Sequence, residues 1–99
     1  MSTQTIHVIA LFKAKPEKAG ALKEFLSKFI EPTLKEMGCL KYVLHQNTSD
    51  PTDLAFIEEW SSHADLDRHL AAPHIQSALP HMGDFLISPP DIRRYVVSR

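Results

Sequence analysis

The chain has 99 residues, 43% of them hydrophobic, and its 11 Lys and Arg nearly balance its 12 Asp and Glu. This length suits one small hydrophobic core and is too short for two, so we expect a single domain over residues 1–99. The balanced charge, without a basic block, excludes a typical nucleic-acid-binding surface. No apolar run approaches the ~20 residues that a membrane span needs.

Two further features concern the cellular compartment. Cys39 is the only cysteine, which excludes an internal disulfide and is typical of a reducing compartment. The first residues, "MSTQTI", contain no basic segment followed by an apolar one, so we expect no signal peptide. The sequence therefore predicts a cytoplasmic protein that contacts neither membrane nor nucleic acid.

The first third of the chain predicts a strand and then a helix. Residues 6–14, "IHVIALFKA", are rich in β-branched and apolar residues, as in a buried strand. Over 16–38 the apolar period becomes helical, with Pro16 placed to open the helix and Gly38 to close it. Pro32 lacks a backbone donor and should kink the helix or start a second segment. The apolar side of the helix consists of Leu22, Phe25, Leu26, Phe29, Ile30, Leu34 and Met37.

The middle of the chain predicts a hairpin. Strands are expected over 39–47 and 54–60, joined by the turn-forming stretch "TSDPTD". Alternation places side chains two residues apart on the same face of a strand. In the first strand, alternation places Leu40, Tyr42 and Leu44 on one face and Cys39, Lys41, Val43 and His45 on the other. In the second strand, the residues that share one face are Leu54, Phe56, Glu58 and Trp60.

The last third predicts helical segments and a final strand. Ser62 is a plausible N-cap for a helix over 61–72, which Pro73 should end or bend. Short helical turns are expected over 74–86, and a last strand over 92–97.

The element order is therefore β-α-β-β-α-β, which predicts an α+β fold, a ferredoxin-like sandwich with both helices on one face of an antiparallel sheet. We expect the first and last strands to lie together at the centre of the sheet. The opposite face carries Val and Ile with nothing in the chain to cover it, so we expect a homodimer through this open sheet face.

Four short stretches carry a resemblance to a known family. In order and spacing, "KPEK", "EMGCLKY", "FIEEW" and "HLAAPH" resemble the antibiotic biosynthesis monooxygenase (ABM) family, closest to its small quinol monooxygenases, from about Ile6 to Tyr95. The resemblance implies a dimeric α+β barrel with a cavity between the helices and sheet of each protomer. It also implies a cofactor-independent monooxygenase that oxidises a small hydroquinone or polyphenolic aromatic substrate with dioxygen. The family also includes haem-degrading enzymes and a small-molecule isomerase.

Three residues are the expected catalytic set. Trp60 would be a flat wall that stacks against the substrate, His69 a general base, and Glu58 the carboxylate that orients His69 or meets a substrate hydroxyl. Each has a structural alternative. Trp60 could be an ordinary core aromatic, His69 could bond a backbone carbonyl, and Glu58 could pair with Arg93 or Arg94.

Tyr42, His7 and His74 are the expected substrate-binding residues. Each again has a structural alternative. Tyr42 could pack in the core, and His74 could only end a helix. His7 could lie in the dimer interface, because alternation along the first strand does not decide whether it faces the cavity or the partner.

We expect no cofactor and no metal site. His63, His69 and His74 lack the spacing of a helical zinc site. The haem-degrading relatives carry an Asn on the first strand, but the only Asn here is Asn47, and the scattered glycines form no phosphate loop. Two other functions stay open. One is an isomerase of a small phosphorylated or keto-hydroxy metabolite, which would use Arg68, Arg93 or Arg94, and the other is a non-catalytic, stress-related or ligand-binding dimer.

Overall fold

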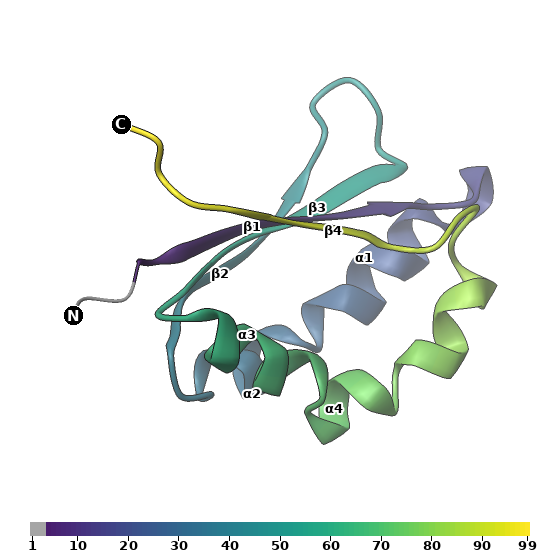
Figure 1. Cartoon of the computed structure of the whole chain (residues 1–99). Coiled ribbons are helices and arrows are strands. Elements are labelled where there is room, and N and C mark those ends of the chain that lie inside the picture. Colours follow the sequence, from purple (N-terminus) through teal and green to yellow (C-terminus); the bar gives the residue numbers. More distant parts are fainter. Residues whose placement is uncertain (1–3) are drawn as a thin grey trace.

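The computed structural model describes residues 4–99 and has one sheet with the helices on one of its faces (Figure 1). Residues 1–3, part of the polar stretch expected to lack a signal peptide, lie outside the described residues. The elements are, in chain order, β1 (Ile6–Lys13), the 3-10 turn η1 (Pro16–Lys18), α1 (Ala19–Ser27), α2 (Ile30–Leu34), β2 (Cys39–Gln46), β3 (Asp53–Trp60), α3 (His63–Leu70), α4 (Pro73–Gln76), the 3-10 segment η2 (Leu79–Asp84) and β4 (Asp91–Tyr95).

The sheet confirms the ferredoxin-like α+β fold and corrects one detail. The strand order is β2-β3-β1-β4 and every pairing is antiparallel. The first and last strands are neighbours, as expected, but they do not share the centre. The central strands are β1 and β3, because β3 pairs with β2 on one side and with β1 on the other. β4 is consequently an edge strand.

The predicted first helix is divided into two segments. The break falls at Lys28 and Phe29, four and three residues before Pro32. Proline has no N–H to donate to the carbonyl four residues earlier, so α1 ends there and α2 begins in a new direction. Thr33 on α2 is fully buried as a result. Gly38 ends the segment with φ +84°, and a Cβ at this position would overlap the Asp65 carboxylate.

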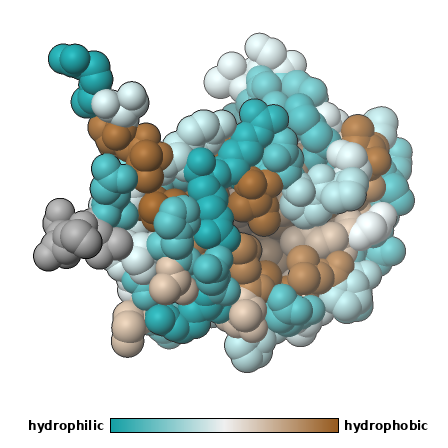
Figure 2. Space-filling view, viewed as in Figure 1, coloured by the Kyte–Doolittle hydropathy of each residue, from teal (hydrophilic) through white to brown (hydrophobic). Residues whose placement is uncertain are grey.

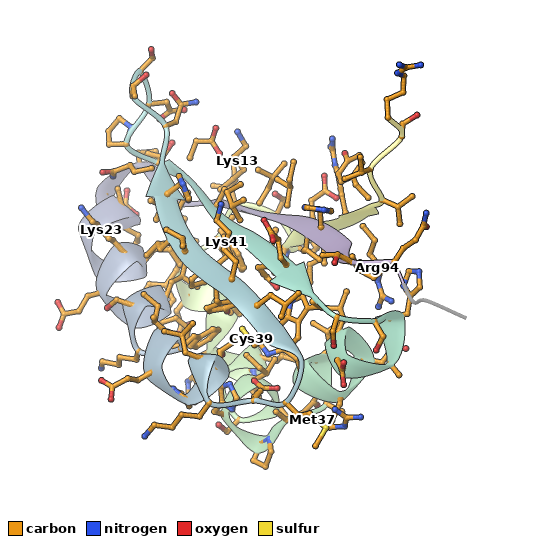
Figure 3. All side chains as sticks on the ribbon, turned by 90° about the vertical axis from the view of Figure 1, so that its left-hand side faces the viewer. Lys13, Lys23, Met37, Cys39, Lys41 and Arg94 are labelled. Carbon is orange, nitrogen blue, oxygen red and sulfur yellow. The ribbon has the colours of Figure 1, made fainter. Side chains whose placement is uncertain are left out.

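A bulge at the start of β2 changes the predicted faces of that strand. Cys39 pairs with Trp60 and Lys41 with Glu59, so Leu40 has no opposite partner. Cys39 packs against the core, whereas Leu40 is exposed, the reverse of the alternation expected from the sequence. Figure 3 labels Cys39 and Lys41 on the two sides of this bulge.

The second helical region begins as expected. Ser62 caps α3, because its hydroxyl accepts a hydrogen bond from the Asp65 backbone N–H at 3.1 Å. Pro73 ends this segment by opening α4. Within residues 4–99, none of the helices combines the length and apolar character required to cross a membrane.

The two sheet faces differ sharply in burial. Alternate residues of β1 and β3 turn toward the helices and form the core with Leu22, Leu26 and Leu66. The opposite face carries Ile9, Ile57 and Val43 side by side across three strands, and these are partly or fully exposed. The candidate site described next lies on the helix-covered side.

Candidate active site

A cavity of about 280 Å³ lies between the helix-covered face of the sheet and the segments α3, α4 and η2. Its mouth is seen as a recess between β4 and these segments, with brown and tan walls (Figure 2). Most of the lining is apolar, and three polar side chains of interest enter it from β2, β3 and α3. The lining residues are Ala10, Phe12, Phe29, Tyr42, Phe56, Glu58, Leu66, His69, Leu70, Ile75, Gln76, Leu79, Met82, Pro90 and Ile92.

His69 lies on α3 at the inner end of this cavity, and it is oriented by a carboxylate that the sequence did not point to. Its Nδ1 lies 2.7 Å from Oε2 of Glu36, a residue between α2 and β2. A carboxylate only accepts, so Nδ1 carries the proton and Nε2 has a free lone pair. Within residues 4–99, no hydrogen bond is formed by Nε2, and no unpaired polar side-chain atom is sealed from solvent. The lone pair therefore remains accessible from the cavity.

The pKa of His69 is lowered from its ordinary value, chiefly because burial disfavours the imidazolium. The hydrogen bond and the charge of Glu36 oppose this effect and raise the pKa, while His74 lowers it slightly. At neutral pH His69 is thus neutral and ready to accept a proton. Glu36 would stabilise the imidazolium that forms.

Glu58 enters the cavity from β3 and is almost completely buried. Its Oε1 accepts a hydrogen bond of 2.8 Å from Nε1 of Trp60, which lies two residues further along the same face. Burial raises the pKa of Glu58 to about 7, the Trp60 hydrogen bond opposes the rise, and the Glu36 carboxylate adds to it. Glu58 therefore exchanges between acceptor-only and donor forms near neutral pH.

Tyr42 on β2 is buried with its ring stacked on Phe56, the centroids 4.2 Å apart. Burial, with the nearby Glu58 charge, raises the pKa of its phenol, while the Thr33 hydroxyl acts in the opposite direction. Tyr42 is thus both core and cavity wall, and its neutral O–H can donate to a ligand. Its ring also meets that of His69 edge-on, with centroids 5.5 Å apart.

Trp60 does not have the expected role. It is completely buried and lies outside the cavity lining, so it cannot be a wall against which a substrate stacks. The indole instead supports the site from behind, because its N–H holds Glu58 and its ring lies 4.7 Å from that of His69. The aromatic walls are instead formed by four other residues: Phe12, Phe29, Tyr42 and Phe56.

Two expected substrate-binding residues also lie outside the cavity. His7 lies on the opposite face of the sheet, where its Nδ1 is 3.8 Å from Oε2 of Glu59. His74 at the start of α4 lies behind His69, with its Nε2 3.2 Å from Glu36 Oε2 and 3.0 Å from the Thr33 hydroxyl. Of the six expected site residues, the structure brings Glu58, His69 and Tyr42 to the cavity.

The structure also decides the alternatives for Glu58 and His69. The arginines proposed to pair with Glu58 have other partners: Arg93 binds Asp91 and Arg94 binds Asp67, each at 2.7 Å. His69 bonds the Glu36 side chain in place of a backbone carbonyl. Glu36 was not identified from the sequence because it is 33 residues from His69 and falls in the helix predicted over 16–38, of which only the apolar side was considered.

Glu36, His69 and His74 are also the residues that could hold a metal ion. One donor atom from each lies within 4.8 Å of the others, and two imidazoles with a carboxylate suit several divalent transition metals. The spacing argument missed this grouping, since the third donor comes from another part of the chain. Cys39 is no candidate nucleophile, because burial, with the charges of Glu36 and Glu58, raises the pKa of its thiol to about 11.

Comparison with known proteins agrees with this fold. The family described as "Antibiotic biosynthesis monooxygenase" matches residues 5–80. The chain is 33% identical over 87 residues to "Putative monooxygenase Rv0793" of Mycobacterium tuberculosis, covering 88% of this chain and 85% of that protein. It is 29% identical over 93 residues to "Uncharacterized protein sll1783" of Synechocystis sp., covering 94% of this chain but only 63% of that protein.

A solved structure gives the same result. PA3566 from Pseudomonas aeruginosa superposes with a TM-score of 0.91 at 28% identity, covering 100% of this chain and 99% of that one. These similarities support a monooxygenase-like function in general terms. On the match over residues 5–80, the chain belongs to the antibiotic biosynthesis monooxygenase family.

Proposed function

We propose that the protein is a cofactor-independent monooxygenase that oxidises a small hydroquinone or polyphenolic aromatic substrate with dioxygen. The observation that carries the proposal is the pairing of His69 with Glu36 at the end of an aromatic cavity. Nδ1 is held by the carboxylate at 2.7 Å, and Nε2 is left with a lone pair for the cavity. A base with a fixed tautomer in an apolar pocket is what deprotonation of a phenol requires.

The proposed chemistry begins with that proton. Nε2 of His69 takes the proton of a substrate hydroxyl, the O–H bond breaks, and its electron pair stays on the phenolate oxygen. The electron-rich phenolate passes an electron to dioxygen, and recombination places oxygen on the ring. Overall, one oxygen atom enters the substrate and the other leaves as water with two hydrogens from the substrate.

The remaining polar groups would position the substrate. The protonated form of Glu58 and the Tyr42 hydroxyl can each donate a hydrogen bond to a second substrate oxygen. Phe29 and Phe56 offer flat apolar surfaces to the ring. A substrate with two oxygens on an aromatic frame suits this arrangement.

The two alternative functions find less support. An isomerase acting on a phosphorylated metabolite needs a cation in the pocket, yet Arg68, Arg93 and Arg94 each bind an Asp and none lines the cavity. A simple apolar binder would leave His69 bonded to backbone, whereas here it bonds the partly buried carboxylate of Glu36.

The experiment is oxygen consumption by the metal-stripped protein against hydroquinones, naphthols and anthrones. We expect uptake above autoxidation that is lost in His69→Gln and kept in His45→Gln, an exposed histidine on β2. Equal uptake by the two variants would contradict the base role. Absence of uptake from every compound, with the fold intact by circular dichroism, would contradict the monooxygenase.

We further propose that the protein is a homodimer through its open sheet face. Ile9, Ile57 and Val43 form a continuous apolar row there, and Tyr95, Val96 and Val97 at the end of the chain are exposed nearby. Sedimentation at micromolar concentration should give twice the monomer mass. Ile57→Lys should give monomer, with Lys23→Glu on α1 as the surface control, and a monomeric wild type would overturn the proposal.

A further inference from the structure

Three side chains from separate segments of the chain converge behind His69. Glu36 follows α2, His69 lies on α3 and His74 lies on α4, and one donor atom from each is within 4.8 Å of the other two. Oε2 of Glu36 is 2.7 Å from Nδ1 of His69 and 3.2 Å from Nε2 of His74, so one carboxylate oxygen is close to both imidazoles. Neither Glu36 nor His74 lines the cavity, and His74 has no part in the proposed reaction.

The spacing of these donor atoms suits a four-coordinate metal ion. Bonds from Zn²⁺ to imidazole nitrogen and carboxylate oxygen are about 2.0–2.2 Å long, which places two ligand atoms of a tetrahedral ion about 3.3 Å apart. Oε2 of Glu36 and Nε2 of His74 already have nearly this separation, at 3.2 Å. The 2.7 Å between Oε2 and Nδ1 of His69 would widen by about 0.6 Å. Two imidazoles and one carboxylate are a known three-ligand set for zinc, with the fourth position left to water.

An ion can reach these donors from solvent without passing through the cavity. The exposed fraction of the side chains is 4% for His69, 16% for Glu36 and 25% for His74, so the His74 side of the cluster is the open one. The hydroxyl of Thr33, which is fully buried, lies 3.0 Å from Nε2 of His74 and holds that ring against the cluster. The donors are therefore close together before an ion arrives, and little rearrangement is needed to bind one.

We propose that Glu36, His69 and His74 form a binding site for a divalent transition metal ion, of which Zn²⁺ fits best, and that the bound ion prevents His69 from acting as a base. The ion is thus an inhibitor of the proposed reaction and not a cofactor for it. The binding site stands on the geometry of the three side chains alone. Its effect on activity rests on the proposed function, because the base role of His69 is what the ion would remove.

Inhibition follows from the two nitrogens of the His69 ring. A neutral imidazole has one N–H and one nitrogen with a lone pair. When Nδ1 gives its lone pair to the ion, the N–H of the ring is at Nε2, the atom left for the cavity. The ion takes the place of the Nδ1 proton beside Glu36, and that proton reaches Nε2 through solvent, so the ring stays neutral and no proton is gained or lost. Nε2 then donates a hydrogen bond and has no lone pair for a substrate hydroxyl.

Binding is tested by adding Zn²⁺ alone to the full chain after a chelator has removed other metals. Isothermal titration calorimetry should show one ion per chain, with a dissociation constant in the micromolar range or lower. His74→Phe keeps a ring in place, and Glu36→Gln keeps an oxygen that can accept from His69. Each removes one ligand and should weaken binding by about 100-fold or more, the upper end of the loss seen when only a residue behind a ligand is changed.

The control is His81→Asn, which removes an exposed histidine of η2 outside the cluster and should leave the affinity unchanged. Equal losses of affinity in His81→Asn and His74→Phe would mean that Zn²⁺ binds surface histidines, and would overturn the site. Absence of binding by the wild type would overturn it as well.

A second readout uses the wild type only, so it does not depend on how the variants fold. Co²⁺ has the same ligand preferences as Zn²⁺ in such sites and is paramagnetic. It should move the ring-proton NMR signals of His69 and His74 far outside their usual range and leave those of His45, on the open face of the sheet, in place. Large shifts confined to other histidines would overturn the proposal.

Oxygen uptake separates this proposal from the proposed function. Saturating Zn²⁺ should lower the uptake that depends on His69 by about 10²-fold or more, and a chelator should restore it. The uptake that remains in His74→Phe should not respond to the same concentration of Zn²⁺. Undiminished uptake with the ion bound would overturn the inhibitory role. Uptake that depends on His69 without any binding of Zn²⁺ would leave the monooxygenase standing and the site wrong. Binding through the cluster without uptake from any phenol would support the site and contradict the monooxygenase.

Discussion

Glu58 and Glu59 are neighbours on β3, yet they lie in opposite environments. Glu58 points under the helices, bonds Trp60 and lines the cavity, and its pKa is raised to about 7. Glu59 points to the open face, where its carboxylate is one-third exposed and lies 3.8 Å from His7. One step along a strand therefore separates a carboxylate that can exchange protons near neutral pH from one that belongs to the surface.

The same contrast holds for the histidines. His69 is deeply buried and held by Glu36, while His7 and His45 lie on the open face of the sheet. The residues that we propose to be catalytic thus all lie on one side of a single sheet. The face that a residue occupies tells more about its role than its chemical type does.

The strongest test of this difference between the two faces is to substitute one histidine on each face. His69→Gln should lower kcat/KM by about 10²- to 10⁴-fold, the usual contribution of a general base. His45→Gln should leave it unchanged. Steady-state oxygen uptake measures kcat/KM for both variants. Equal losses of kcat/KM would mean that His69 is not the general base.

A second contrast uses the paired glutamates and stability. Because the folded-state pKa of Glu58 is raised, the unfolded chain loses this proton first, and wild-type stability falls between about pH 4.5 and 7. Glu58→Gln removes this dependence, so its stability relative to wild type should increase with pH, by up to about 3 kcal/mol at pH 8.

Glu59→Gln is the matched control for that experiment and should show no such trend. Urea unfolding at pH 4.5, 6 and 8 gives the free energies of unfolding directly. If the difference in free energy of unfolding between Glu58→Gln and wild type did not change with pH, the carboxyl of Glu58 would be solvated in the folded protein.

Trp60→Phe tests whether the indole supports Glu58. The substitution keeps an aromatic ring but removes the N–H donor, so the buried carboxyl of Glu58 loses a hydrogen bond. We expect the free energy of unfolding to decrease by about 1–3 kcal/mol. Because that hydrogen bond lowers the pKa of Glu58, its loss should raise the pKa above about 7. Thermal unfolding gives the cost, and carbon-13 NMR of the carboxyl gives the direction.

The smallest expected effect sharpens the role of Glu36. In wild type, kcat/KM should fall on the acid side with a midpoint below the ordinary His pKa of ~6.5, because burial lowers that of His69. Glu36 raises this pKa, so Glu36→Gln should move the midpoint to lower pH and reduce the plateau about tenfold. A midpoint that moves upward would mean that Glu36 does not favour the imidazolium.

Much of the fold could be predicted from local signals. The Ser62 cap, the end of the helical segment at Pro73 and the alternation along β3 are properties of neighbouring residues, and all three appear in the structure. The centre of the sheet was predicted wrongly because the order of strands depends on pairings between distant segments. The bulge at Leu40 was missed since alternation assumes an uninterrupted strand.

The site could be predicted only in part, because local patterns show which face a residue occupies but not how distant segments meet. Alternation along β3 identified the face that Glu58 and Trp60 share, but not depth, so the fully buried Trp60 was mistaken for a cavity wall. Glu36 reaches His69 only because the chain turns at Gly38 and brings two distant helical regions together. The position of an acidic residue just before a helix-ending glycine was the one available signal.

The bulge has a consequence for how this chain tolerates changes of length. Leu40 is the one residue of β2 without a partner opposite it, and without it Cys39, Lys41 and Tyr42 would alternate regularly against β3. A deletion at this position should therefore leave Glu36 on one side and Tyr42 on the other in their present registers. A deletion at Val43 would instead reverse the orientation of every residue of β2 that follows. Insertions and deletions in this hairpin should accordingly accumulate at residue 40 and be excluded a few residues further on.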